Sequence, residues 1–195
     1  QIESIPNGLF ACQFGFESAL EHLQFGDRLD QNFLLSYSYL LPAGEAALTH
    51  WRSLWKKGGR TFKWKIGVTS PEEEINIFQQ LVTILPETAK LRLDANGGLN
   101  LEDAKTWLNI TDRTNLVEFV EQPLSPQQFD RILELSKNYR TAIALDESVA
   151  NLVQLENCYQ KGWRGIYVIK PGIFGSPQKL RDFCQQTHID VVFSS

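Results

Sequence analysis

The sequence contains few cysteines, and their positions exclude two classes of structure. The three cysteines, Cys12, Cys158 and Cys184, are far apart and odd in number. A disulfide-stapled domain has an even set of cysteines and a structural zinc site has closely spaced pairs, so neither is predicted here. Unpaired thiols are typical of a reducing compartment, and we therefore expect a cytoplasmic location.

Long apolar runs and an excess of positive charge are also missing. The richest apolar stretch, residues 33–43, is far shorter than the roughly 20 residues of a membrane span and contains two serines. The 19 basic and 23 acidic residues give a net charge of −4, which provides no basic surface for a nucleic acid. The N-terminus has no basic and apolar regions of the kind that form a signal peptide. We expect neither a membrane nor a nucleic acid as a partner.

Methionine is absent altogether, and the sequence ends within an apolar run, residues 190–195. We interpret both features as signs of a piece of a longer protein. The 195 residues correspond to about one domain at roughly 150 residues per domain. With 43% hydrophobic residues, the composition supplies a core and argues against disorder.

Short β-like runs alternate with amphipathic stretches, which predicts a parallel sheet covered by helices. No glycine-rich phosphate-binding motif follows any of the runs, although open nucleotide-binding sheets normally carry one. Unbroken strand–helix order therefore favours a barrel, truncated here because a complete barrel takes about 250 residues. The predicted strands lie within residues 33–41, 61–68, 90–95, 116–121, 141–146, 165–170 and 190–193.

Residues 7–25, which precede these units, are predicted to form a helix because their apolar residues recur at helical spacing. We therefore expect a lead-in helix within residues 1–30 and a partial barrel over residues 31–195. The following helices are predicted to begin at residues 44, 70, 100, 125, 151 and 176.

Ionisable residues stand near the C-terminal ends of five consecutive predicted strands. Parallel strands bring these ends to one edge, where barrel enzymes have their active sites. Side-chain alternation places Lys63 and Lys65 opposite large apolar side chains, whereas Lys170 shares its face with Ile166 and Val168, and all the candidates are expected to point inward. The ionisable candidates are Lys63, Lys65, Asp94, Glu121, Asp146 and Lys170, and Asn96 shares a face with Asp94.

Three of these candidates are carboxylates, which cannot all stay ionised in a confined site without a cation. Oxygen ligands select a hard divalent ion, for which Mg²⁺ fits best and Mn²⁺ could substitute. A sheltered lysine beside such an ion has a lowered pKa and can act as a base. The set predicts removal of a proton next to the carboxylate of a small-molecule substrate.

Five motifs at these strand ends together resemble the muconate-lactonising subgroup of the enolase superfamily. The resemblance implies an α/β fold, a modified TIM barrel of the (β/α)7β type, without its N-terminal capping domain and last strand region here. Residues 169–176 look like those of subgroup members that make o-succinylbenzoate. The motifs are FKWK (62–65), RLDANG (92–97), EQPL (121–124), ALDES (144–148) and VIKP (168–171).

The resemblance also implies a reaction, in which Asp94, Glu121 and Asp146 would bind Mg²⁺. Lys65 would remove the α-proton of 2-succinyl-6-hydroxy-2,4-cyclohexadiene-1-carboxylate and then protonate the departing hydroxyl. The products would be o-succinylbenzoate and water, in menaquinone or phylloquinone biosynthesis. Lys170 would stabilise the enediolate by its charge.

Other residues receive supporting roles from the same resemblance. Lys63 would lower the pKa of Lys65 and contact the substrate carboxylate. Asn96 would support the metal ligands. Ser194 and Ser195 would touch the substrate.

Three other functions remain open at this stage. An N-acylamino-acid racemase or dipeptide epimerase would use Lys65 and Lys170 as opposed bases in the same site. A Schiff-base aldolase would use Lys170 as the nucleophile, but it leaves three carboxylates without a role. A binding scaffold would need no metal. The sequence does not indicate an oligomeric state.

Overall fold

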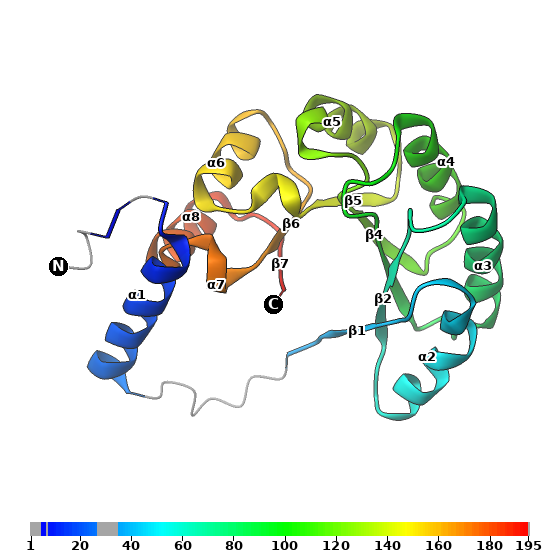
Figure 1. The fold of residues 1–195 in the computed structure, drawn as a ribbon, viewed down its shortest axis with the longest axis horizontal. Coiled ribbons are helices and arrows are strands. Elements are labelled where there is room, and N and C mark those ends of the chain that lie inside the picture. Colours follow the sequence, from blue (N-terminus) through cyan, green and yellow to red (C-terminus); the bar gives the residue numbers. More distant parts are fainter. Residues whose placement is uncertain (1–4, 7, 27–34, 195) are drawn as a thin grey trace. The chain divides into compact units, whose positions relative to one another are not determined.

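The structure, a computed structural model, describes residues 5–6, 8–26 and 35–194 (Figure 1). The chain forms two compact units. The larger unit is Ser36–Glu147, and the smaller unit combines Gln1–Leu35 with Ser148–Ser195. The expected division near residue 30, between a lead-in helix and a partial barrel, stays a prediction.

The larger unit alternates strands with helices, as predicted. Its strands are parallel and pair in chain order, from β1 with β2 to β4 with β5. Helices α3, α4 and α5 cover one face of these strands (Figure 1). The strands are β1 (Ser38–Leu40), β2 (Thr61–Lys65), β3 (Lys90–Asp94), β4 (Val117–Glu121) and β5 (Ala142–Leu145). The helices are α2 (Ala47–Lys56), α3 (Pro71–Ile84), α4 (Leu101–Thr111) and α5 (Phe129–Asn138), with short 3-10 turns at Gly44–Ala46 and Pro126–Gln128. A third 3-10 turn, Glu147–Val149, begins at the last residue of this unit and continues into the smaller one.

Side-chain caps start α3 and α4 where the sequence predicts these two helices to begin. The Ser70 side chain accepts a hydrogen bond from the backbone N–H of Glu73 ahead of α3. The Asn100 side chain accepts one from the backbone N–H of Asp103 ahead of α4. Each cap satisfies an N–H group that the first helical turn leaves unpaired. The predicted helix starts at residues 70 and 100 are therefore confirmed.

An aromatic cluster in the larger unit fixes which face of β2 meets the helices. Trp64 of β2 lies edge-on to Trp107 of α4, with ring centroids 6.3 Å apart. Phe78 of α3 packs against the same Trp107 ring at 5.5 Å. All three side chains are buried. Because side chains alternate along a strand, this packing turns Lys63 and Lys65 to the opposite face.

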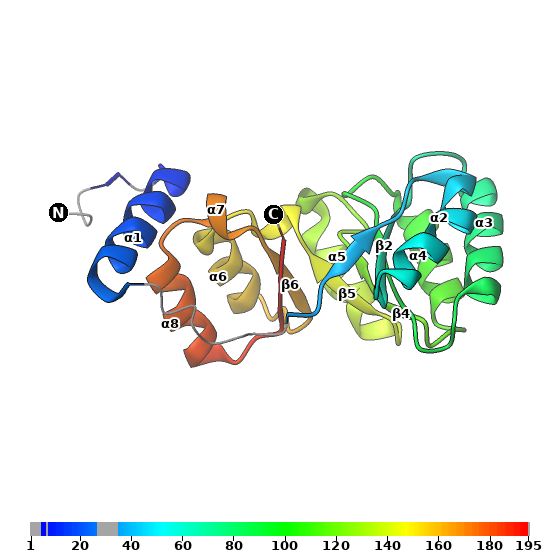
Figure 2. The ribbon, with the colours of Figure 1, turned by 90° about the horizontal axis from the view of Figure 1, so that it is seen from below.

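The smaller unit contains two parallel strands, β6 and β7, and four helices among its described residues. Helix α1 packs beside α7 and α8 (Figure 2). The helix expected at residues 7–25 is confirmed from residue 10 onward, and residue 7 lies outside the described residues. The elements are α1 (Phe10–Phe25), α6 (Leu152–Gln160), β6 (Ile166–Ile169), α7 (Pro171–Phe174), α8 (Pro177–Thr187) and β7 (Val191–Phe193).

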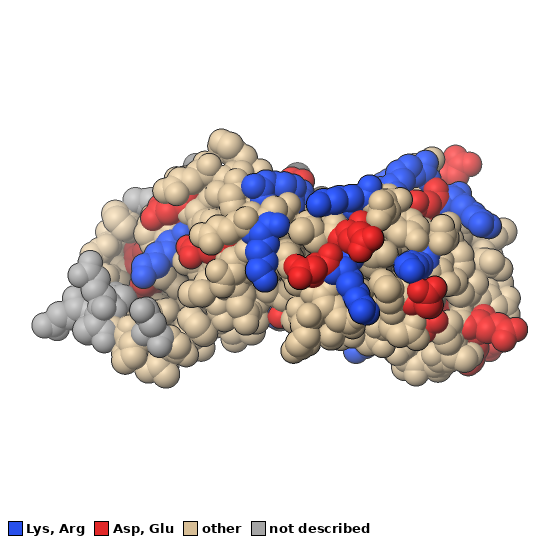
Figure 3. Space-filling view, turned by 90° about the horizontal axis from the view of Figure 1, so that it is seen from above, with Lys and Arg blue, Asp and Glu red and all other residues tan. Residues whose placement is uncertain are grey.

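The surface agrees with the mixed charge of the sequence. On the face drawn in Figure 3, Lys and Arg side chains are interspersed with Asp and Glu, without one broad basic area among the described residues. None of the helices in the described part of the chain is long and apolar enough to cross a membrane.

Candidate active site

The ends of strands β2 to β5 bring the candidate residues of the larger unit together. In the register of the sheet, Lys65 is the Cα partner of Asp94, Asp94 of Glu121, and Glu121 of Ala144. Lys65, Asp94 and Glu121 therefore lie side by side across three neighbouring strands, as the strand spacing predicts. Asp146 lies two residues beyond Ala144, directly after the end of β5.

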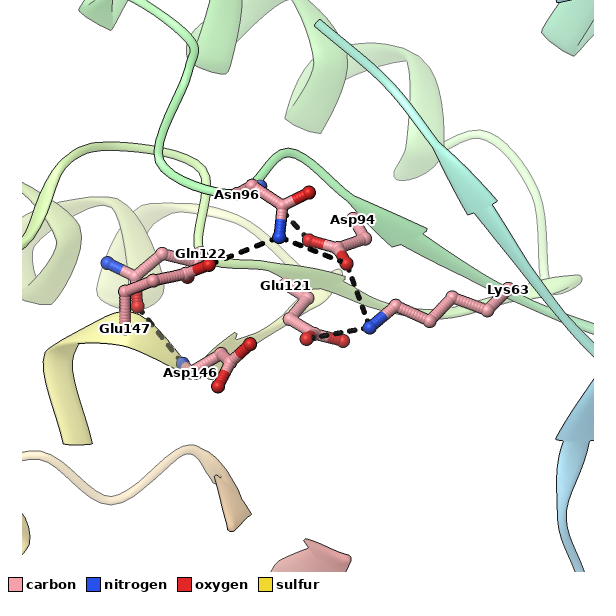
Figure 4. A network of polar contacts seen from close by, with 7 residues as sticks. All are labelled: Lys63, Asp94, Asn96, Glu121, Gln122, Asp146 and Glu147. Atoms are coloured by element: carbon pink, nitrogen blue, oxygen red, sulfur yellow. Dashed lines mark hydrogen bonds and ion pairs between the residues drawn. The ribbon is translucent and has the colours of Figure 1, made fainter. Parts of the chain in front are cut away.

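The ammonium group of Lys63 joins two of the three carboxylates (Figure 4). Its Nζ lies 2.8 Å from Asp94 Oδ2 and 2.8 Å from Glu121 Oε1. Burial by itself lowers the pKa of Lys63, but the charges of Glu121 and Asp94 outweigh it and raise the pKa above its ordinary value. Lys63 is thus held as a cation on the carboxylates. Its expected effect on the pKa of Lys65 stays a prediction.

The three carboxylates are buried and lie close enough for their charges to act on one another. Glu121 is 2% exposed, Asp146 5% and Asp94 7%. Burial and the charge of Asp94 raise the pKa of Glu121 to about 7, although Lys63 lowers it. The carboxylate of Asp146 extends toward Glu121 and raises that pKa further (Figure 4). A buried group of like charges favours an added cation.

Asn96 donates two hydrogen bonds to the carboxylate of Asp94. Its backbone N–H donates to Asp94 Oδ1 at 3.0 Å, and its side-chain Nδ2 donates to Asp94 Oδ2 at 3.4 Å. The same Nδ2 donates to Glu147 Oε1 at 3.1 Å. Asn96 has a φ of 44°, a conformation that asparagine adopts more readily than most residues. The structure therefore places Asn96 beside a proposed metal ligand.

Sequence patterns do not single out two further polar residues of the site, Gln122 and Glu147. Gln122 is fully buried, and its Oε1 accepts a hydrogen bond from the backbone N–H of Asp146 at 3.0 Å. Glu147 Oε2 is buried and has no hydrogen-bond partner among the described residues. The one available signal is position, because each residue directly follows a candidate carboxylate in its motif.

The donor chemistry of this site fits a hard divalent cation. Three buried carboxylates, the Glu147 oxygen without a hydrogen-bond partner among the described residues and the raised pKa of Glu121 all indicate negative charge concentrated at these strand ends, where a hard divalent ion would find oxygen ligands. Within the described residues, however, no three His, Cys, Asp or Glu side chains are yet arranged to hold a metal ion. The carboxylates would have to close around such an ion.

The remaining candidates are placed as follows. Lys65 is the last residue of β2 and is exposed. Lys170 directly follows β6 in the smaller unit and precedes α7. The backbone N–H of Ser194 donates to Ile169 O at 2.8 Å, and Ser195 lies outside the described residues. The expected catalytic and substrate-binding roles of these residues stay predictions.

Known proteins share both the sequence and the fold. The o-succinylbenzoate synthase of Thermosynechococcus vestitus is 43% identical over 180 residues, covering 91% of this chain and 55% of that protein. The crystal structure of o-succinylbenzoate synthase from Thermosynechococcus elongatus BP-1, complexed with Mg in its active site, superposes with a TM-score of 0.92 at 41% identity. That match covers 100% of this chain and 61% of the other. The muconate lactonizing enzyme of Pseudomonas putida shares the fold, with a TM-score of 0.83 at 20% identity over 97% of this chain and 56% of its own.

The chain thus spans little more than half the length of the proteins it resembles. These similarities confirm the predicted fold class, an α/β barrel of the enolase type, of which the described residues provide seven strands. The family model described as "Enolase C-terminal domain-like" matches residues 46–194. The chain belongs to the enolase C-terminal domain-like family.

Proposed function

We propose that the protein dehydrates 2-succinyl-6-hydroxy-2,4-cyclohexadiene-1-carboxylate to o-succinylbenzoate, a carbon–oxygen lyase reaction that depends on Mg²⁺. The observation that carries this proposal is the group of buried carboxylates with Lys63 at the ends of β2 to β5. The 43% identity to a named o-succinylbenzoate synthase supports the choice of substrate. The reaction would serve menaquinone or phylloquinone biosynthesis in the cytoplasm.

Asp94, Glu121 and Asp146 would hold the Mg²⁺ ion, with Mn²⁺ as a substitute. The Mg²⁺-complexed relative supports this choice of metal. When bound, the ion would supply positive charge next to the substrate carboxylate, where negative charge develops as the α-proton leaves. Asn96 would keep Asp94 oriented through its two hydrogen bonds.

Lys65 would move the proton. Its neutral amine would take the α-proton, and the electron pair of that C–H bond would form the new ring double bond as the hydroxyl leaves. Lys65 would return the proton to the departing hydroxyl, which releases water. Lys63, a cation at neutral pH because its pKa is raised, would also contact the substrate carboxylate. Lys170 would contribute stabilising charge, and Ser194 and Ser195 would contact the substrate.

Product formation with and without metal tests the proposal. The protein with Mg²⁺ should convert the cyclohexadiene substrate to o-succinylbenzoate, measured by chromatography, and EDTA should abolish turnover until Mg²⁺ is restored. Lys65→Ala should lower kcat by about 10²–10⁴-fold, the range of general acid–base catalysis. Lys170→Ala should lower kcat by about 10²–10³-fold, the usual cost of removing one group that stabilises developing negative charge. Lys105→Ala, which removes an exposed lysine of α4, is the control and should retain activity.

Other outcomes would overturn the proposal. Turnover that survives EDTA would exclude the role of the metal. Absence of product together with solvent deuterium exchange into N-succinyl amino acids would identify a racemase or epimerase instead. Trapping of a substrate adduct on Lys170 by borohydride would indicate a Schiff-base enzyme.

A further inference from the structure

A buried glutamine is hydrogen-bonded to the main chain next to the carboxylates of the site. Gln122 directly follows Glu121, is 0% exposed and has a φ of 38°. Residues other than glycine rarely adopt a positive φ, and such a backbone conformation persists only where the surroundings hold it in place. The contacts of Gln122 show which parts of the larger unit hold it.

The backbone of Gln122 connects the strands on both sides of β4. Its N–H donates to Ala144 O of β5 at 2.8 Å. Its carbonyl oxygen accepts from the N–H of Gly97, in the loop after β3, at 2.7 Å. The residue that follows the Glu121 carboxylate is therefore tied to the strand ends that carry Asp94 and Asp146.

The side-chain amide of Gln122 makes a second pair of bonds. Its Oε1 accepts from the backbone N–H of Asp146 at 3.0 Å (Figure 4). Its Nε2 donates to Leu124 O at 2.8 Å, which fixes the orientation of the amide. The bond to Asp146 spans 24 residues of sequence, so it joins two strand ends that the chain itself does not hold together.

We propose that Gln122 is a positioning residue that sets the spacing between the carboxylates of Glu121 and Asp146 for one divalent cation. The inference rests on the proposed function. Its physical basis is that residues behind metal ligands orient them by hydrogen bonds, so a tie between the main chains of Glu121 and Asp146 limits how far their carboxylates must move to close around an ion. Gln122 provides this because its backbone follows one carboxylate and its side chain binds the main chain of the other.

Two substitutions separate the parts of this contact. Gln122→Asn keeps the amide and tolerates the positive φ, but it is one methylene too short to reach Asp146. Gln122→Met keeps the length and the burial but cannot accept the hydrogen bond. Both should weaken Mg²⁺ binding by about 10–100-fold, the usual cost of removing a residue that orients metal ligands.

A matched control exists in the smaller unit. The side chain of Gln154 also accepts a backbone hydrogen bond, from Ala150 N–H at 2.9 Å, but it is exposed and lies on α6 rather than next to a strand end that carries a carboxylate. Gln154→Asn therefore makes the same chemical change outside the site. The affinity of the Gln154→Asn variant for Mg²⁺ should equal that of the unmodified protein.

The measurement is the dissociation constant for Mg²⁺ alone, obtained by titration calorimetry, together with kcat at rising Mg²⁺ concentration. A spacing defect raises the Mg²⁺ concentration needed for half-maximal activity and leaves much of kcat recoverable, whereas general damage lowers kcat at every concentration. Unchanged affinity in both folded variants, or loss of folding in both, would overturn the role of Gln122. Absence of Mg²⁺ binding by the unmodified protein would instead overturn the proposed function.

Discussion

At the scale of single residues, buried polar side chains fix the loops next to the site. Glu74 of α3 is 3% exposed, and its carboxylate accepts hydrogen bonds from the backbone N–H groups of Gly67, Val68 and Thr69 at 2.7–3.0 Å. These three residues follow Lys65 and Ile66 in the loop between β2 and α3. Helix propensity explains an acid in the first turn of α3 but not this contact, which depends on the fold of that loop.

Substitution of Glu74 should destabilise the larger unit. Glu74→Gln leaves one carbonyl oxygen for three N–H groups, so at least one of them loses its acceptor, at a cost of about 0.5–1.5 kcal/mol, the net contribution of a typical hydrogen bond. Urea unfolding, followed by circular dichroism, measures this as a lower midpoint. Glu72→Gln, in the same helical turn but exposed, is the control and should change the midpoint much less. Equal midpoints for the two variants would show that the three hydrogen bonds do not stabilise the fold.

At the scale of elements, one carboxylate connects the end of α4 to the start of β5. Asp112 follows α4 and accepts hydrogen bonds from the backbone N–H of Arg140 at 3.0 Å and from the N–H and Oγ1 of Thr141 at 2.6 and 2.7 Å. Burial alone raises the pKa of Asp112, but the bonds from Thr141 and Arg140 outweigh it and lower the pKa below its ordinary value.

This shift predicts a pH dependence of stability. Because the pKa is lower in the folded chain, the charge of Asp112 stabilises the fold above its ordinary value of 3.8, and this contribution is lost as pH falls through the folded-state pKa. Asp112→Asn should therefore lower the urea midpoint near neutral pH, and the difference should shrink below pH 3.8. Asp130→Asn, at an exposed position of α5, is the control. A difference that stays constant with pH would contradict the prediction.

The same scale shows how far local signals extend. The strand expected over residues 61–68 ends at Lys65, because Gly67 adopts a φ of 75° and Glu74 binds the next N–H groups. The short helix α7 is not predicted, because Gly172 and Gly175 make its sequence typical of a loop. Helices with clear caps, by contrast, begin where expected.

At the scale of the whole molecule, binding of the proposed metal should be linked to folding. An ion that binds only the folded protein stabilises it by about 2.7 kcal/mol when its concentration is 100 times Kd. Mg²⁺ should therefore raise the thermal unfolding midpoint, and EDTA should reverse the rise. Asp146→Asn should reduce the effect, and NaCl at equal ionic strength should not reproduce it. A thermal unfolding midpoint that does not change when Mg²⁺ is added would argue against a metal site.

The sequence by itself determined the order of the strands and of every long helix, the starts of the capped helices α3, α4, α6 and α8, and the set of candidate carboxylates and lysines, because periodicity, caps and strand-end positions are local properties. Only the tertiary structure decided that Lys63 bridges Asp94 and Glu121, although Lys63 and Glu121 are 58 residues apart. It also decided that Gln122 holds Asp146. These contacts depend on sheet register and on backbone groups that no local pattern encodes, since any residue type supplies the same N–H and C=O groups.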